Sequence, residues 1–314
     1  MPNSKPHVLV LGGNFAGLGC AQKIREAAGS AVDITLVDRK PYLAYIPNIP
    51  QEVFANRDPM QTLRMDIVGP LDKDDIRFVE AEVTAIDLET QRVECVPTER
   101  DGAEPHALRY DFLVIALGNR LAYDRIEGFA EHGHTVTDTW HGDKLRRYLH
   151  EDYKGGPIAV GSARFHQGDG TDGVRLYNGH EFPVSVAACE GPPVEVMLSL
   201  GTWLTEHGRG KPSTVTVFTP ADMIAEDAGE DIVHKLLDLA SQLGFNYVHS
   251  ANDIKKITAD GIEFANGQSL DVELKIVFPD WCAQDVVRSL PVADSEGFVV
   301  TDLTMRNPKY PNVF

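Results

Sequence analysis

One of the four cysteines in this chain stands where a thiol is expected to be reactive. Cys189 comes just before Gly191, Pro192 and Pro193, and prolines are favoured in the first turn of a helix. Apolar residues then recur at helical spacing, which predicts a helix over residues 193–206. The positive end of a helix dipole favours a nearby thiolate, the nucleophilic form of cysteine. The sequence therefore predicts a nucleophile at Cys189, with a buried structural cysteine as the alternative.

The N-terminal residues are typical of a pyrophosphate-binding site. A strand-like run over residues 7–11 leads into a glycine turn and then a helical pattern, and the turn consists of Gly12, Gly13, Asn14, Phe15, Ala16 and Gly17. Gly12 permits a tight turn, Gly17 lets the helix pack close to the strand, and the helix N-terminus faces a diphosphate. Asp38 follows the next strand, residues 33–37, about 20 residues after Gly17, where a carboxylate can bind ribose hydroxyls. Together these residues predict a dinucleotide site.

The turn departs from the dinucleotide fingerprint at one position. Asn14 stands where the fingerprint has its middle glycine, the residue that brings the backbone closest to the pyrophosphate. The alternative interpretation is an ordinary strand-to-helix turn whose glycines serve packing alone. The context of strand, helix and Asp38 favours the dinucleotide site.

The composition favours a globular α/β protein and argues against several partners. With 314 residues, 43% of them apolar, the chain is long enough for two domains. A net charge of −18 argues against nucleic acid and gives no attraction to an anionic membrane surface. No apolar run is long enough to span a membrane and no secretory signal is apparent, so a cytoplasmic location is expected. Cysteines and histidines lack metal-ligand spacing, so no metal site is expected.

The expected elements form two α/β units. In the first, strands over residues 76–79, 83–87, 92–96 and 108–110 precede a buried strand that runs from 112 to Gly118. The proline-rich segment 39–57 is expected to be a loop over an apolar surface, because prolines exclude a regular helix or a central strand.

The second unit repeats the alternation of strand and helix. Helices are expected over residues 143–151, 193–206 and 231–243, and strands over 157–160, 214–218 and 274–278, the last returning the chain to the first unit. We therefore predict an α/β fold with two tandem Rossmann-like dinucleotide-binding domains, the second inserted in the first. The expected bounds are residues 1–120 with 281–314 for the first domain, and residues 121–280 for the second.

Several segments, in this order, resemble the two-dinucleotide-fold flavoproteins of the pyridine nucleotide-disulfide oxidoreductase superfamily. The resemblance is closest to the sulfide:quinone oxidoreductase and flavocytochrome c sulfide dehydrogenase branch. The residues that carry it are the glycine turn, Asp38, Tyr45 to Pro50, Ala116 to Asn119, Cys189 to Glu195 and Asn307 to Phe314. It implies a glutathione reductase-like fold with FAD as cofactor. The implied FAD-binding residues are Gly12, Gly13, Asn14, Phe15, Ala16, Gly17, Asp38, Arg39, Pro47, Val83, Ala116 and Gly118.

The resemblance also implies sulfur chemistry. Sulfide oxidation needs a cysteine that holds sulfane sulfur while two electrons pass to FAD, and the resemblance places it at Cys189 with Glu195 as a proton carrier. Cys282 lies where relatives bring a loop to the flavin, so it is a second candidate; the alternative is a core cysteine beside Trp281. Sulfide or another small sulfur donor is the implied substrate, and quinone or a cytochrome subunit the acceptor. The additional cysteines of the sulfide:quinone enzymes are absent here.

In relatives, a segment like Asn307 to Phe314 leads into further FAD-binding residues, part of the quinone pocket and an amphipathic membrane anchor. Since the sequence as given stops at Phe314, an incomplete FAD-binding domain is expected. Peripheral membrane contact is expected through that further region. Whether the chain forms a homo-oligomer is left open.

Two other functions stay open. Type-II NADH:quinone dehydrogenases share this architecture but bind NADH through a glycine turn in the second domain. Here the corresponding strand runs into Gly161-Ser162-Ala163-Arg164-Phe165-His166, which is no pyrophosphate loop and so favours a sulfur donor over a nicotinamide. The third hypothesis is a non-catalytic relative that binds FAD or a partner for assembly.

Overall fold

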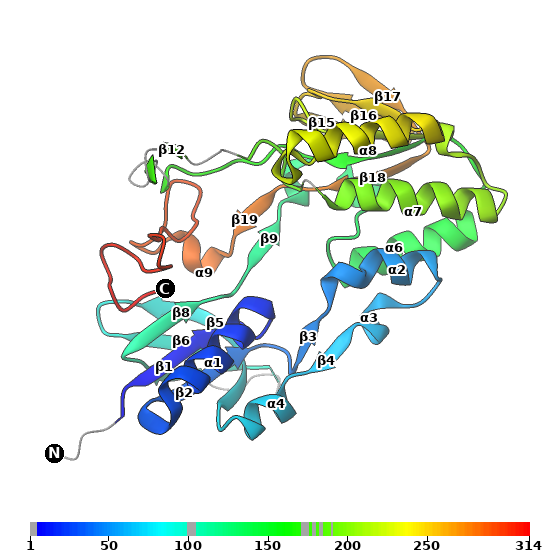
Figure 1. Ribbon diagram of the computed structural model, residues 1–314. Coiled ribbons are helices and arrows are strands. Elements are labelled where there is room, and N and C mark those ends of the chain that lie inside the picture. The colour runs from blue at the N-terminus through cyan, green and yellow to red at the C-terminus, as the bar shows by residue number, and fades with distance from the viewer. Residues whose placement is uncertain (1–4, 99–104, 171–175, 178–179, 182–184, 190) are drawn as a thin grey trace.

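In the computed structural model, which describes residues 5–98, 105–170, 176–177, 180–181, 185–189 and 191–314, most strands gather into two sheets (Figure 1). The first sheet has the strand order β7-β6-β5-β2-β1-β8, and the second has the order β14-β13-β10-β18. Four neighbouring strands of the first sheet and all four strands of the second run parallel. The predicted α/β fold with two Rossmann-like sheets is confirmed.

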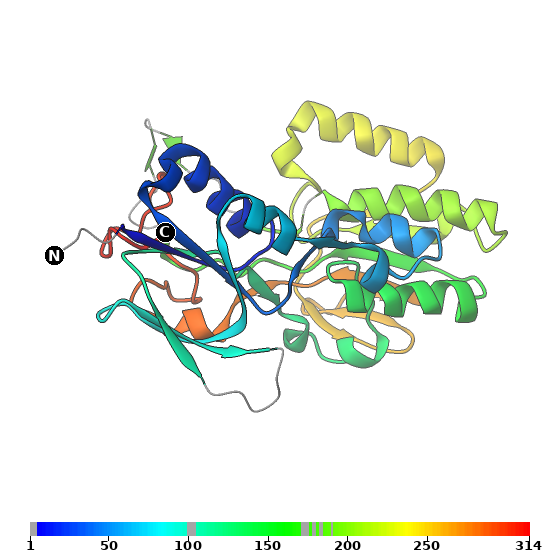
Figure 2. The same ribbon diagram turned by 90° about the horizontal axis from the view of Figure 1, so that it is seen from below.

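The central strand β1 of the first sheet is buried on both faces. Alternate residues of β1 enter different cores: Val8 and Val10 pack with α1 and α4, whereas Leu9 and Leu11 pack with the C-terminal part of the chain. Figure 2 shows α1 and α4 on one side of this sheet and α9 on the other. Burial on both faces explains why β1 reads as a continuous apolar run. The elements are β1 (His7–Leu11), α1 (Phe15–Ala28), β2 (Asp33–Asp38), α4 (Val68–Lys73), β5 (Arg77–Asp87), β6 (Arg92–Pro97), β7 (His106–Arg109), β8 (Phe112–Ile115) and α9 (Asp285–Arg288).

β5 differs from its prediction. The two strands expected over residues 76–79 and 83–87 are one strand, and its pairing with β6 shifts register between Val83 and Ala85. A bulge of this kind interrupts the alternation of side chains without ending the strand, which is why the sequence pattern suggested a break.

The proline-rich segment 39–57 contains regular structure, so the prediction of a loop was wrong. The segment contains β3 (Tyr42–Ala44), a 3-10 turn (Ile46–Asn48) and α2 (Ile49–Phe54). After it come α3 (Pro59–Thr62) and β4 (Arg64–Asp66), and β4 pairs with β3. Pro50 stands in the first turn of α2, where a helix tolerates the missing N–H. Buried Ile49 and Val53 pack α2 against the core of the second half, so the expected apolar contact is present.

The second sheet carries helices α6, α7 and α8 and a small antiparallel sheet (Figure 1). Asp138 caps α6, which therefore begins at Thr139, four residues before the expected start. β18 has the expected bounds but is the edge strand of this sheet rather than the segment that returns to the first half. The elements are α6 (Thr139–Arg147), β10 (Ile158–Ser162), α7 (Pro192–Glu206), β13 (Val215–Phe218), α8 (Glu230–Leu243), β14 (Asn246–Val248), β15 (Ile254–Ile257), β16 (Gly261–Phe264), β17 (Ser269–Asp271) and β18 (Leu274–Phe278).

Two paired strands connect the halves. β9 (Asn119–Leu121) leaves the first half and β19 (Trp281–Ala283) returns to it, and the two run antiparallel side by side (Figure 1). After β19 and α9 the chain reaches β8 again, where Phe314 N–H donates to the Leu113 carbonyl at 2.9 Å. The domain bounds near residues 120 and 281 stay a prediction. The remaining short elements are α5 (Phe129–His132), β11 (Leu176–Tyr177) and β12 (His180–Glu181).

Within the described ranges, no helix combines the length and the apolar character that crossing a membrane requires.

Candidate functional site

The glycine turn after β1 leaves no room for side chains at two of its positions. Gly12 has φ +102°, and a Cβ there would stand 2.2 Å from the Ala116 carbonyl oxygen. A Cβ on Gly17 would stand 1.8 Å from the Gly12 carbonyl oxygen. Both glycines are therefore required for β1, α1 and the end of β8 to approach this closely.

Asn14 replaces the middle glycine of the fingerprint without strain. Its φ of −88° and ψ of −165° are extended values that any residue adopts. Its side-chain oxygen accepts the Phe15 N–H at 3.0 Å and so caps α1. The substitution therefore keeps the helix N-terminus directed at the turn, which is the feature that an anion would use.

Asp38 faces the glycine turn from the end of β2. One carboxylate oxygen accepts the Gly13 N–H at 2.6 Å, and the other accepts the Lys40 N–H at 2.9 Å. The spacing in the sequence therefore does bring this carboxylate to the turn. A carboxylate has about four lone-pair sites, so both oxygens keep capacity for ribose hydroxyls.

A cavity of about 440 Å³ opens over these residues. Its lining includes seven of the twelve residues that the resemblance implied for FAD: Gly12, Asn14, Asp38, Arg39, Val83, Ala116 and Gly118. Lining residues come from β2, β3, β5, β9 and β19, so the cavity extends from the carboxyl edge of the first sheet to the connection between the halves. Such an edge is where open α/β sheets bind nucleotides.

The other five predicted cofactor residues do not line this cavity. They are Gly13, Phe15, Ala16, Gly17 and Pro47. Gly13 contributes its N–H to Asp38, and Gly17 shapes the turn. Phe15 is exposed and meets the exposed Tyr45 ring edge-on at 5.9 Å. Pro47 is exposed in the turn before α2, whereas its neighbour Ile46 reaches the cavity.

Residues that the sequence did not single out line the far end of the cavity. Thr137, Asp138 and Trp281 stand there, together with Leu121. The Asp138 carboxylate accepts two hydrogen bonds from His141, one from the backbone N–H at 2.8 Å and one from the ring Nδ1 at 2.6 Å. Burial would raise the pKa of Asp138, but these hydrogen bonds outweigh it and lower the pKa below the ordinary value. The one local signal was a capping aspartate before a helix, and this signal does not reveal a cavity.

Cys189 lies at the carboxyl end of β10. Its N–H donates to Ser162 Oγ at 2.9 Å, and the half-buried side chain packs against the core of the second half. The residues just before it pair with the residues just after β10, because Phe165 N–H donates to the Val186 carbonyl and Ala188 N–H to the Ala163 carbonyl, both at 2.9 Å. Over the described residues 163–169, which directly follow β10, no helix begins, so the strand-to-helix turn that binds pyrophosphate is absent from this stretch.

The start of α7 offers Cys189 a helix dipole but few N–H donors. Pro192 and Pro193 have no N–H, and the next two amides, of Val194 and Glu195, donate to the Gly191 carbonyl at 3.0 and 3.3 Å. Any stabilisation of a thiolate there comes from the dipole rather than from direct hydrogen bonds to these amides. Glu195 is exposed in the first turn, and Glu190 lies outside the described residues.

Cys282 is buried in β19, opposite Arg120 of β9. All four cysteines are thiols, so the expected partnership of Cys189 and Cys282 takes no disulfide form here. The segments are nevertheless joined, because Trp281 Nε1 donates to the carbonyl of Ala188, at 2.7 Å. Neither cysteine is among the residues that line the cavity described above.

The comparisons with known proteins decide the family. A family model described as pyridine nucleotide-disulphide oxidoreductase matches residues 6–178, which contain the glycine turn, Asp38 and β10. This chain belongs to that family. Its superfamily and its fold were predicted from the sequence.

The proteins similar to this member of the pyridine nucleotide-disulphide oxidoreductase family have names that describe different activities. The type II NADH:quinone oxidoreductase of Staphylococcus epidermidis is 30% identical over 154 residues, 49% of this chain and 36% of that protein. The sulfide:quinone oxidoreductase structure from Aquifex aeolicus has a TM-score of 0.80 and 22% identity over 98% of this chain and 67% of that one. NDH2 from Plasmodium falciparum in complex with NADH has a TM-score of 0.71 and 14% identity over 99% and 63%. The chain thus matches about a third of the length of the curated relative, and the structural likenesses show the fold.

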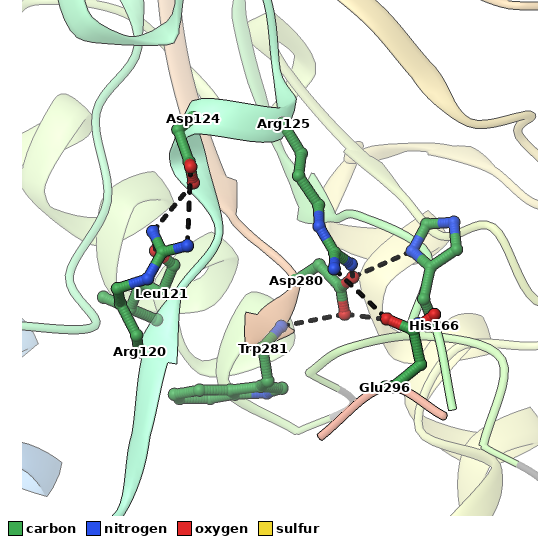
Figure 3. A network of polar contacts seen from close by, with 8 residues as sticks. All are labelled: Arg120, Leu121, Asp124, Arg125, His166, Asp280, Trp281 and Glu296. Atoms are coloured by element: carbon green, nitrogen blue, oxygen red, sulfur yellow. Dashed lines mark hydrogen bonds and ion pairs between the residues drawn. The ribbon is translucent and has the colours of Figure 1, made fainter. Parts of the chain in front are cut away.

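A network of polar contacts joins the two halves of the pyridine nucleotide-disulphide oxidoreductase fold beside Trp281 (Figure 3). Asp280 is 3% exposed. Its carboxylate accepts three hydrogen bonds, each 2.8 Å long, from Arg125 Nη1, from His166 Nδ1 and from the Trp281 N–H. Arg125 also donates to Glu296 at 3.2 Å. Burial would lower the pKa of Arg125, yet Cys282, Glu296 and Asp280 raise it above the ordinary value. The buried carboxylate is therefore fully paired, as burial of a charge requires.

Proposed function

We propose that this chain binds FAD and oxidises sulfide with Cys189, passing the electrons through FAD to a quinone. The observation that carries the proposal is the position of Cys189, whose N–H is held by Ser162 at the carboxyl end of β10. That edge of a Rossmann-like sheet is where a ligand binds, and here a thiol occupies it in place of a glycine turn.

The residues present fit FAD. The turn at Gly12 and Gly17 admits no side chain, the first turn of α1 faces it, and Asp38 presents a carboxylate beside it. We propose that Gly12, Asn14, Asp38, Arg39, Val83, Ala116 and Gly118 hold FAD along the cavity, with Gly13, Gly17, Phe15, Ala16 and Pro47 shaping its walls from outside. FAD would supply a two-electron acceptor that a quinone can reoxidise.

In this proposal the hydrosulfide sulfur bonds to the Cys189 sulfur as its S–H bond breaks and the proton leaves. The two electrons would pass to FAD, and the sulfur stays on the cysteine as sulfane sulfur. Cys282, buried in β19, is the second candidate sulfur ligand. Glu195, exposed on the first turn of α7, would exchange the released proton with solvent. Since quinones reside in membranes, the proposal includes a cytoplasmic location with peripheral membrane contact.

NADH oxidation is the second candidate function. It is favoured by the 30% identity to the Staphylococcus epidermidis type II NADH:quinone oxidoreductase. Against it stands the segment after β10, which pairs with residues 186–188 and forms no pyrophosphate turn.

An anaerobic absorbance experiment separates the candidates. FAD-loaded protein is mixed with sulfide or with NADH, and the experiment is repeated with Cys189→Ala and with Cys20→Ala, which removes another partly exposed thiol. We expect sulfide to bleach the flavin in the wild type and in Cys20→Ala but not in Cys189→Ala. Bleaching by NADH alone would replace the proposal with the second candidate. Bound flavin that neither donor reduces would instead favour a non-catalytic FAD-binding relative.

A further inference from the structure

Trp281 touches both the cofactor cavity and the segment that carries Cys189. Its half-buried side chain lines the far end of the cavity, beyond the glycine turn. Its indole Nε1 donates to the Ala188 carbonyl at 2.7 Å, one residue before Cys189. Within the described part of the chain, Trp281 is the lining residue that donates a hydrogen bond to residues 185–189.

The backbone of Trp281 is held from three directions. Its N–H donates to the Asp280 carboxylate at 2.8 Å, and Asp280 is fixed in turn by Arg125 and His166 (Figure 3). The carbonyl of Asp280 accepts the Ala122 N–H at 2.7 Å. Trp281 also pairs with Leu121 in the β9–β19 ladder. These contacts fix the point from which the indole reaches the Ala188 carbonyl, so Trp281 can hold the neighbouring segment in place.

The Cys189 segment is held on its other side by the end of β10. Ala188 N–H donates to the Ala163 carbonyl, and Cys189 N–H donates to Ser162 Oγ, each at 2.9 Å. The peptide before Cys189 therefore has its N–H fixed by the second half of the molecule and its carbonyl fixed by Trp281. Removal of the indole N–H would remove the hydrogen bond that ties this segment to β19.

We propose that Trp281 is a positioning residue, which sets the distance between the Cys189 thiol and the far end of the cavity, the flavin end, where the flavin ring of FAD would lie. This inference rests on the proposed function, because it assigns Trp281 to the sulfur chemistry of Cys189. Its indole would form the wall between the flavin end and the thiol, and its Nε1–H would fix the thiol against that wall.

The first test compares Trp281→Phe, which keeps an aromatic ring but removes the donor, with Trp203→Phe. Trp203 is buried in α7 and its Nε1 has no partner within the described residues, so that variant loses no hydrogen bond. The measurement is the rate at which iodoacetamide alkylates Cys189, followed on its own peptide by mass spectrometry in FAD-loaded protein. A neutral hydrogen bond contributes about 1 kcal/mol, so we expect Trp281→Phe to alkylate about fivefold faster than the wild type. Equal rates in the wild type and both variants would overturn the proposal.

A second measurement tests the placement at the cavity. The chain has three tryptophans, and the double variant Trp140→Phe, Trp203→Phe keeps only Trp281. FAD binding should quench the fluorescence of Trp281 in this variant. FAD binding without quenching would overturn the placement.

The rate at which sulfide reduces the flavin shows whether the positioning role or the proposed function fails. We expect flavin reduction by sulfide to be about fivefold slower in Trp281→Phe than in Trp203→Phe, by the same hydrogen-bond energy. If sulfide reduces the flavin equally fast in both, the positioning role fails and the proposed function stands. If sulfide does not reduce even the wild type while the alkylation rates differ as expected, the proposed function fails and the position of Trp281 stands.

Discussion

At the scale of the residue, Gly17 sets how closely α1 approaches β1. The nearest atom to a Cβ there would be the backbone carbonyl oxygen of Gly12, which cannot move aside as the end of a flexible side chain could. The same oxygen belongs to the residue that turns the chain toward the cavity. A substitution at Gly17 should therefore disturb the turn and the cofactor site together.

We expect Gly17→Ala to lower the free energy of unfolding by about 1–3 kcal/mol, the usual cost of overpacking. FAD affinity should fall at least about tenfold, since displacement of the turn removes donors that a diphosphate needs. Urea denaturation and FAD titration measure the two effects.

Gly19→Ala is the matched control, because Gly19 lies in the same helix and the added Cβ would have no heavy atom within 4 Å. Alanine is favoured over glycine in a helix by about 0.5–1 kcal/mol, so the control should be no less stable than the wild type. Equal behaviour of the two variants would contradict the argument.

At the scale of the element, Glu52 joins α2, α3 and the turn before α2. This buried carboxylate accepts Arg57 Nε at 2.8 Å, Thr62 Oγ1 at 2.7 Å and Asn48 Nδ2 at 3.0 Å. The Arg57 hydrogen bond is the main reason that the pKa of Glu52 lies below its ordinary value. Because α2 follows Ala44 and Ile46, which line the cavity, Glu52 also supports the cavity wall.

Glu52→Ala should lower the free energy of unfolding by about 2 kcal/mol or more, because hydrogen bonds to a charged group each contribute about 1.5–3 kcal/mol. Gln51→Ala removes the exposed neighbour on the same helix and should change stability by less than about 0.5 kcal/mol. Chemical denaturation of the two variants side by side measures the difference. If both unfold at the same denaturant concentration, Glu52 does not hold these elements together.

The elements differ in how well the sequence alone predicted them, for physical reasons. β18 has its predicted bounds because a strand in a parallel sheet reads as an apolar run with clear ends. α2 was missed because its stability comes from Ile49 and Val53 packing on a distant core, a contact that no local pattern encodes.

The candidate site divides in the same way. Gly12, Gly17 and Asp38 were found because a strand, a turn and a helix adjacent in sequence place them together. Asp138 and Trp281 were missed as cavity residues because they are more than a hundred residues apart and only the fold brings both to one end of the cavity. The sequence singled out Cys189, and its role as a reactive thiol stays a prediction; its link to Trp281 is a tertiary contact that spacing cannot predict.

At the scale of the whole molecule, we expect His134 to make the fold sensitive to acid. It extends the second sheet, since its N–H donates to the Lys275 carbonyl at 2.9 Å and its carbonyl accepts the Val277 N–H at 2.7 Å. Its ring is buried beside Tyr148, with 4.8 Å between ring centroids, and its Nδ1 has no partner within the described residues. Burial, together with the charges of Lys144 and Lys275, lowers the pKa of His134 from 6.5 to about 3.

The sign of the pH effect follows from these two pKa values. Below pH 6.5 His134 binds a proton in the unfolded chain but stays neutral in the folded chain, so the free energy of unfolding decreases as the pH is lowered, down to about pH 3.

Within this pH window, each unit by which the pH is lowered reduces the free energy of unfolding by about 1.4 kcal/mol. Between pH 6 and pH 4 the wild type should therefore lose about 2.5 kcal/mol more stability than His134→Phe, which keeps a ring against Tyr148 but cannot be protonated. His234→Phe, at an exposed position of α8, should fall in parallel with the wild type. Urea denaturation at pH 6, 5 and 4 measures all three proteins, and a His134→Phe curve parallel to the wild type would show that another group causes the acid sensitivity.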